Sequence, residues 1–154
     1  MIVKPSDFQA EISIGQVEQL DVQANVNLFI EKYEPKFLKL LLGSALAEQL
    51  RAAMEGTTPE QKWIDLAERV KLSCANYIYY WYQRDAVTVS AGVGEVEPKA
   101  ENAVRAEVIG KMVRAWNEMV ELNVEFISWI DDRVYPVYRA RLSDIFSTIN
   151  QSGV

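Results

Sequence analysis

The residue types that most often carry catalysis and metal binding are nearly absent from this sequence. It contains no histidine and a single cysteine, Cys74, among 154 residues. Without imidazole, these residues cannot build the Ser-His-Asp and Cys-His nucleophilic mechanisms or the common transition-metal sites. One thiol allows neither an intrachain disulfide nor a cysteine-cluster zinc site. Carboxylates remain as the main catalytic candidates, and we predict no catalytic residue, no cofactor and no metal site.

The carboxylate pairs give little support for acid–base or cation chemistry. Asp131 and Asp132 are neighbours, and adjacent side chains on a helix point about 100° apart, which disfavours a shared acid–base dyad. Glu95 and Glu97 could share one face of an extended segment and bind a hard cation weakly. A solvated, charged loop is the simpler interpretation. Nearby, Gly92-Val93-Gly94 lacks the third glycine of a dinucleotide-binding loop.

The aromatic run 77–82 is the most conspicuous segment, with the sequence Tyr77-Ile78-Tyr79-Tyr80-Trp81-Tyr82. It could stack nucleic-acid bases or a ligand, or it could serve as core and protein interface. Stacking platforms have basic surroundings, and this sequence is acidic, so we favour the second interpretation. Because six consecutive helical residues cover all sides of a helix, we predict that Tyr79 and Tyr80 contact a partner. Cys74 lies on the preceding apolar seam and is predicted to be an inert buried thiol.

The charge balance argues against nucleic acid as a partner. Sixteen basic and 22 acidic residues give a formal net charge of −6, and no basic stripe exists to neutralise phosphates. We therefore predict no specific DNA or RNA binding. The start of the sequence does not resemble a signal peptide, and no segment is long and apolar enough to span a membrane. The expected location is the cytoplasm.

Helical spacing of apolar residues predicts at least four substantial helices. The first is expected to begin near Asn25, and Pro35 should kink or divide it. Gly43 then indicates a stop, and Ser44 the N-cap of a further helix. Residues 1–24 are predicted to form an irregular arm that packs on the body, with a short helical turn at Pro5-Ser6-Asp7.

Three further helices follow in the predicted order. Thr58, Pro59 and Gln61 form a capping-box start. The seam behind it, with spacings of four and three, is Trp63, Ala67, Val70, Cys74, Tyr77 and Trp81. The longest helix is predicted over roughly 101–132, where two apolar seams favour a central position. A final helix is expected from about Pro136.

Residues 87–98 interrupt this rhythm because valines alternate with small or polar residues around Ala91 and Gly92. The pattern favours a short β-hairpin or an extended, protruding loop. Such a loop is suited to inserting between subunits and becoming ordered on assembly, although a plain connector is equally compatible. The predicted contacts from this loop are Val87, Val89, Val93, Glu95 and Val96. The fold class is all-α: one helical domain over 1–154, whose two long central helices are joined by this loop.

Several segments together resemble a family of small structural proteins from tailed phages and prophages of gut bacteria. They are Phe29–Glu34, Phe37–Gly43, Tyr77–Thr88, Gly92–Gly94, Pro98–Ala103 and Arg114–Met119. The family is similar in size and helical character to head–tail connector, or head-completion, proteins. The resemblance covers most of residues 26–123 and includes no catalytic motif, and Pro35 interrupts its first helix.

The resemblance implies a non-enzymatic subunit that assembles with itself into a ring between the portal and the tail or neck proteins of a virion. Its location would be the host bacterial cytoplasm and then the virion. The acidic charge agrees with a channel that passes DNA without gripping phosphates. Two alternatives stay open. The chain could be a small helical binding or regulatory module that acts as a homodimer, or an enzyme that relies on carboxylates alone.

Overall fold

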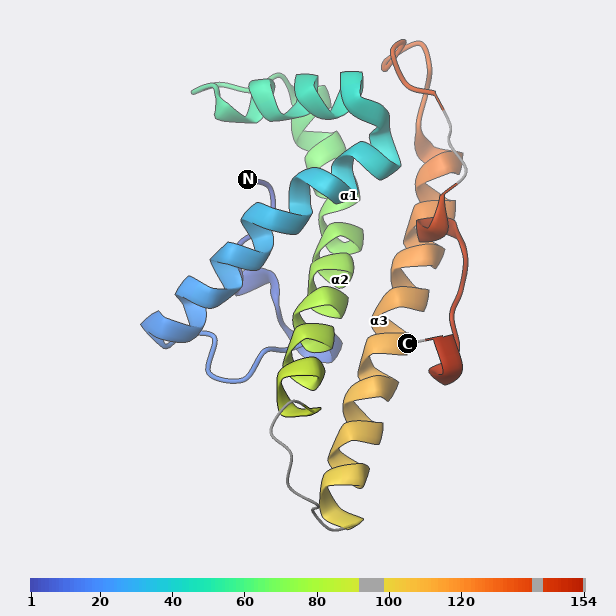
Figure 1. The fold of residues 1–154 in the computed structure, drawn as a ribbon. Helices are drawn as coiled ribbons and strands as arrows, with labels where there is room; N and C mark the ends of the chain where they lie inside the picture. The colour runs from blue at the N-terminus through green and yellow to red at the C-terminus, as the bar shows by residue number, and fades with distance from the viewer. Residues whose placement is uncertain (92–98, 140–142, 154) are drawn as a thin grey trace.

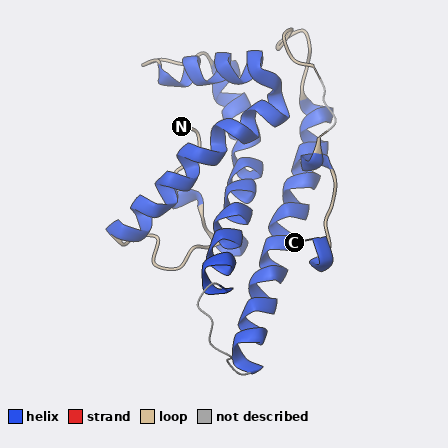
Figure 2. Ribbon diagram, viewed as in Figure 1, coloured by secondary structure: helices blue, strands red, loops and turns tan. Residues whose placement is uncertain are grey.

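The computed structural model describes residues 1–91, 99–139 and 143–153 (Figure 1). Three long helices dominate: α1 (Leu20–Glu55), α2 (Gln61–Ala91) and α3 (Lys99–Trp129). Short 3-10 turns occupy Pro5–Asp7, Ala10–Ile12, Asp144–Phe146 and Gln151–Gly153. Figure 2 shows no strand within the described ranges. The predicted all-α class is confirmed.

Helix α2 holds the middle of the arrangement. It packs against α1 on one side and runs antiparallel to α3 on the other (Figure 1). The sequence predicted the central position for the helix over 101–132, but the structure gives that place to α2. The segment proposed to join the two adjacent helices, 92–98, lies outside the described residues.

The predicted seam of α2 explains this position. Ala67, Val70, Cys74 and Tyr77 are buried, while Trp63 and Trp81 at its two ends are half-buried. Neighbouring positions such as Leu66 and Ile78 are buried as well. Because the apolar stripe is wider than one seam, α2 can cover itself only by contacting helices on two sides.

Helix α1 begins five residues before the predicted start at Asn25 and is broken at Gly43 instead of at Pro35. Gly43 has φ 78° and ψ 161°, a conformation that glycine adopts without steric cost, so the predicted stop there is confirmed. Pro35 lies inside a continuous helix. It leaves the carbonyl of Glu31 without its helical donor, and Glu31 is exposed, so water can satisfy that group.

Both ends of α2 differ from the sequence prediction. The first helical hydrogen bonds run from the amides of Trp63 and Ile64 to the carbonyl of Glu60, at 2.9 and 3.4 Å. The helix therefore starts two residues beyond Pro59, and Thr58 is not its cap. At the other end, 87–91 are helical, so the prediction of a loop or hairpin over them is wrong. Extending an existing helix adds one hydrogen bond per residue, whereas a strand needs a partner strand.

The N-terminal arm, residues 1–19, packs on the helices as predicted, and its turn at Pro5–Asp7 is confirmed. Its apolar side chains are buried: Ile2, Val3, Phe8, Ile12 and Ile14. One carboxylate oxygen of Glu34 accepts hydrogen bonds from the amides of Ile2 and Val3, both at 2.9 Å. Glu34 is only 3% exposed, so this carboxylate lies within the contact between arm and α1.

The helix predicted from Pro136 does not form in the described residues. The chain instead makes turns over 132–137 and a single 3-10 turn at Asp144–Phe146. The C-terminal tail, residues 143–150, runs along α3 (Figure 1). Its backbone bonds to side chains of Trp116, Asn117 and Asn123 on α3. Because α3 supplies these partners, the tail does not need a helical hydrogen-bond ladder of its own.

Candidate interaction sites

The contacts predicted from the 87–98 segment fall into two groups. Val87 and Val89 belong to the last turns of α2, and their side chains lie outside the described part of the structure. Val93, Glu95 and Val96 lie outside the described residues altogether. Their proposed role in assembly stays a prediction.

Tyr79 and Tyr80 do not lie on a free surface, which corrects their assignment as partner contacts. Tyr79 is 1% exposed and Tyr80 3% exposed. The ring of Tyr80 meets Trp116 of α3 edge-on, with 4.8 Å between centroids. Burial raises the pKa of Tyr79, an effect that nearby Lys111 only partly opposes. Both tyrosines belong to the core because α2 is covered on two sides.

Aromatic side chains connect α1 to the end of the aromatic run 77–82 in α2. Tyr33 stacks on Trp81 with 5.3 Å between centroids and 5° between ring planes. The Lys32 and Lys36 ammonium groups lie 5.1 and 5.0 Å from the Tyr33 centroid, and the Arg84 guanidinium 5.2 Å from that of Trp81. Cation–π contacts of this kind stabilise helix packing. The rings face one another, so the group is a packing element and not an open stacking platform.

Cys74 is fully buried, as predicted. Burial and, secondarily, the Glu34 carboxylate raise the pKa of its thiol well above the ordinary value of 9.0. A thiol without access or thiolate character is a poor nucleophile. Asp131 is engaged by Arg133, whose backbone amide and guanidinium donate to its carboxylate at 2.8 to 3.1 Å. The structure therefore gives Asp131 a role in a turn.

Exposed apolar side chains gather near the end of α3 and in the turns after it. They are Val124, Ile127, Trp129, Val134 and Val137. Val124 and Ile127 are three residues apart on a helix and therefore share one face. We call these five residues the apolar end surface. Nothing in the local sequence pattern distinguished them, because the same valines and isoleucine also fit a buried seam.

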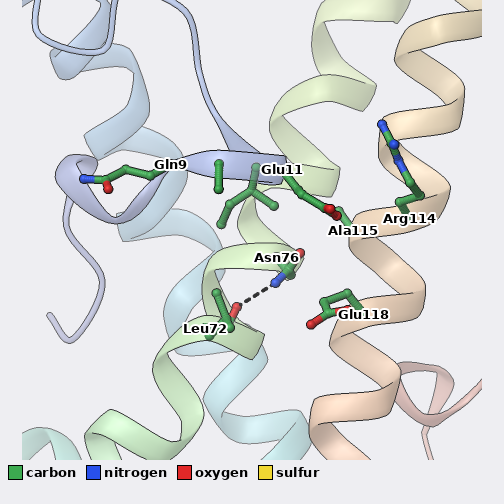
Figure 3. Close-up of a pocket in the computed structure, with 9 residues that line it drawn as sticks. Gln9, Glu11, Leu72, Asn76, Arg114, Ala115 and Glu118 are labelled. Carbon is green, nitrogen blue, oxygen red and sulfur yellow. Dashed lines mark hydrogen bonds between the residues drawn. The ribbon is translucent and has the colours of Figure 1, made fainter.

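A cavity of about 280 Å³ lies where the arm meets α2 and α3 (Figure 3). Its lining residues come from all three elements: Gln9, Ala10, Glu11, Ile12, Leu72, Asn76, Arg114, Ala115 and Glu118. None of them was predicted to belong to a site, since they are separated by more than a hundred positions in the sequence. This cavity brings apolar walls together with two carboxylates, two amides and one guanidinium.

Within the described ranges, no group of three or more Cys, Asp or Glu side chains is placed to hold a metal ion. No helix among those residues is both long and apolar enough to cross a membrane.

Comparisons with known proteins found no relative of this chain. No family model, no curated protein and no solved structure matches it.

Proposed function

We propose that this chain is a structural subunit that assembles with copies of itself, in the manner of a head–tail connector ring of a tailed phage. The observation that carries the proposal is the apolar end surface. Exposed apolar side chains that share one face of a helix mark contacts with other macromolecules. Val124 and Ile127 share a face of α3 and lie more than one-third exposed, without a covering element from the described chain.

A ring requires one surface to meet a different surface of the next subunit, since head-to-tail contacts close by rotation. The apolar end surface supplies one of the two. Burying Val124 and Ile127 would contribute roughly 1.5–3 kcal/mol each at most, before ordering costs. The resemblance of the sequence to small phage structural proteins supplies the context: portal on one side, tail or neck proteins on the other. The net charge of −6 fits a subunit that does not hold DNA.

Solution mass over a wide concentration range tests this proposal. We expect the wild-type chain to form a closed oligomer larger than a dimer, visible as rings by negative-stain electron microscopy. The Val124→Asp/Ile127→Asp variant should stay monomeric with an unchanged circular dichroism spectrum. A matched control is Leu28→Asp, which changes an exposed apolar residue of α1 away from this surface.

Three outcomes would count against this proposal, two of them against the ring and one against the apolar end surface. A wild-type chain that stays monomeric at all concentrations contradicts assembly, and a closed dimer supports the homodimeric binding module instead. Assembly that survives the Val124→Asp/Ile127→Asp change excludes the apolar end surface as the contact. The Val93→Asp/Val96→Asp variant in the same assay tests whether the 92–98 segment takes part.

A further inference from the structure

The N-terminal arm is held by groups on all three long helices. Its first turn, Pro5–Asp7, lies against α1, and its second, Ala10–Ile12, lies against α2 and α3. Asp7 pairs with Lys71 of α2, with 3.2 Å between Oδ1 and Nζ. The arm is joined covalently to these helices only at the start of α1. The helices of a second copy therefore present the same partners to it.

The last five residues of the arm, 15–19, form a hinge with little packing of its own. Val17 is half-buried, and the other four residues are exposed. A Cβ added at Gly15 would meet no atom within 4 Å. In Figure 1 the chain makes an open loop between the second turn of the arm and the start of α1. The hinge can therefore change its path without disturbing the core.

The hinge is bent through a backbone conformation that its sequence disfavours. Gln16 has φ 58°, in the left-handed region that residues with a Cβ rarely adopt. One backbone hydrogen bond, from the Gln19 amide to the Gln16 carbonyl at 2.9 Å, closes the turn. A short hinge under strain favours exchange of the attached element between copies, because a straightened hinge loses the strain while the element keeps its contacts.

We propose that in the assembled protein this strained hinge straightens and the arm is exchanged between neighbouring copies. Residues 1–14 of one subunit then lie on α1, α2 and α3 of the next. The inference rests on the proposed self-assembly and gives it a directional link, with the arm as donor and the helical surface beneath it as acceptor. Five extended residues span about 17 Å, more than the diameter of a helix, so the hinge can cross a subunit boundary.

Exchange preserves the chemistry that holds the arm. The amides of Ile2 and Val3 bond to Glu34 of the neighbouring copy, and Asp7 pairs with its Lys71. Because the same groups are buried in both forms, the balance depends on relief of strain at Gln16 and on the contact through the apolar end surface. Joining two copies costs entropy, so chains with a disrupted end surface keep their own arms. Since the arm is tightly held, copies exchange arms while they fold together.

Cross-linking across the pair of Asp7 and Lys71 tests the exchange. The Asp7→Cys/Lys71→Cys variant is refolded at low and at high concentration, treated with a short bis-maleimide and run on a denaturing gel. Native Cys74 is buried and stays unreacted. We expect intrachain links after dilute refolding and covalent multimers after concentrated refolding. Links that stop at two copies indicate reciprocal exchange in a dimer, and a longer ladder indicates exchange around a ring.

A matched control pair lies entirely within the helices. Arg69 of α2 and Glu125 of α3 also pair at 3.2 Å, so the Arg69→Cys/Glu125→Cys variant should give intrachain links at every concentration.

Two hinge substitutions move the equilibrium in opposite directions. Gln16→Gly removes the steric penalty of the bent form and should lower the ratio of intersubunit to intrachain links about fivefold. Gln16→Pro excludes a positive φ and should raise that ratio.

The failure of exchange can be told apart from the failure of assembly. An oligomer by solution mass whose Asp7→Cys/Lys71→Cys links are all intrachain overturns the exchange and leaves the proposed self-assembly standing. A chain that stays monomeric at all concentrations overturns both. Equal ratios in Gln16→Gly and Gln16→Pro, or equal multimer yields from the Arg69→Cys/Glu125→Cys control, also overturn the exchange.

Discussion

The N-terminal arm and the C-terminal tail are both irregular segments that lie along helices, yet different chemistry holds them. The arm buries five apolar side chains and gives two backbone amides to the Glu34 carboxylate. The tail buries less: within 143–150 only Ile145 is fully buried. It depends on neutral hydrogen bonds from Trp116, Asn117 and Asn123.

The contrast shows two ways in which a helix can replace the hydrogen bonds that an irregular chain cannot make within itself. A buried carboxylate binds strongly and is costly to lose, because its donors are then stranded without water. The neutral side chains of α3 each bond weakly to a different backbone group of the tail, and each bond can be lost without the others. The arm should therefore behave as part of the core, and the tail as a set of separable contacts.

The largest effect is expected from Glu34→Ala. The substitution strands the buried amides of Ile2 and Val3, so we expect the free energy of unfolding to fall by about 3–5 kcal/mol. Chemical denaturation measures it. Glu31→Ala, on the exposed side of the same helix, should change stability by less than about 0.5 kcal/mol. A loss below about 1 kcal/mol for Glu34→Ala would show that the arm is held by apolar burial alone.

The second-largest loss of stability is expected from substitution of Asn123, a fully buried residue whose side-chain amide holds the tail. It donates to the carbonyl of Ile145 at 2.8 Å and accepts from the hydroxyl of Ser73 at 2.5 Å. Asn123→Ala should cost about 2–3 kcal/mol because both partners lose a bond in a buried place. Adding Ser73→Ala should cost less than its single effect, since the bond between the two side chains is already lost and the hydroxyl keeps only the Met119 carbonyl at 3.3 Å. Strict additivity in this double-mutant cycle would mean that the bond contributes nothing.

Asn117 should give a smaller and more local effect. Its side chain pairs with both backbone groups of Ile149, at 2.9 and 3.1 Å, and is only half-buried. Asn117→Ala should cost about 1 kcal/mol in global stability, while hydrogen exchange at the Ile149 amide becomes about tenfold faster. Glu121→Ala on the same helix is the control. Equal acceleration across α3 would show that the tail is not a separable element.

The smallest effect is expected at Asp131, in the turn that leads toward the tail. Hydrogen bonds from the Arg133 guanidinium and then from its backbone amide lower the pKa of this carboxyl below its ordinary value of 3.8. The folded state therefore releases this proton more readily than the unfolded chain. The stabilisation is present above the unfolded pKa and is lost as the pH falls through the folded pKa.

Carboxyl-detected NMR titration measures this pKa directly. Arg133→Gln should raise the Asp131 midpoint toward the ordinary value. Arg139→Gln removes the same charge from a residue that bonds to other carbonyls, and should leave the midpoint in place. Because Asp131 and Arg133 form their contact at the surface, global stability should change little in either variant. An unmoved midpoint in Arg133→Gln would contradict the assignment.

Much of the helical layout was predictable from local spacing. The seam through Val70, Cys74 and Tyr77 follows directly from the period of the α-helix, and Gly43 marks a break because only glycine adopts its conformation freely. Predictions failed where the conformational preference of a short segment was overridden by the helix next to it. The alternating valines near Val87 continue a helix, and the residues after Pro136 follow the surface of α3.

The candidate sites were less accessible to sequence reasoning. Tyr79 and Tyr80 were assigned to the surface because a helix has an outer side, but α2 has none over that stretch. Asn76 and Glu118 carry no motif, and only packing of α2 on α3 places them around one cavity. The apolar end surface similarly depends on which helical faces stay uncovered.

By itself, the sequence determined the helical class, the main apolar seam and the absence of imidazole chemistry, because these depend on residue type and on spacing within one turn or two. Only the tertiary structure decided which polar residues are buried. Glu34 and Asn123 resemble surface residues locally, and their partners lie 31 and 22 positions away in Val3 and Ile145. A buried polar group is stable only where a distant backbone completes its hydrogen bonds, and that meeting is a property of the folded chain alone.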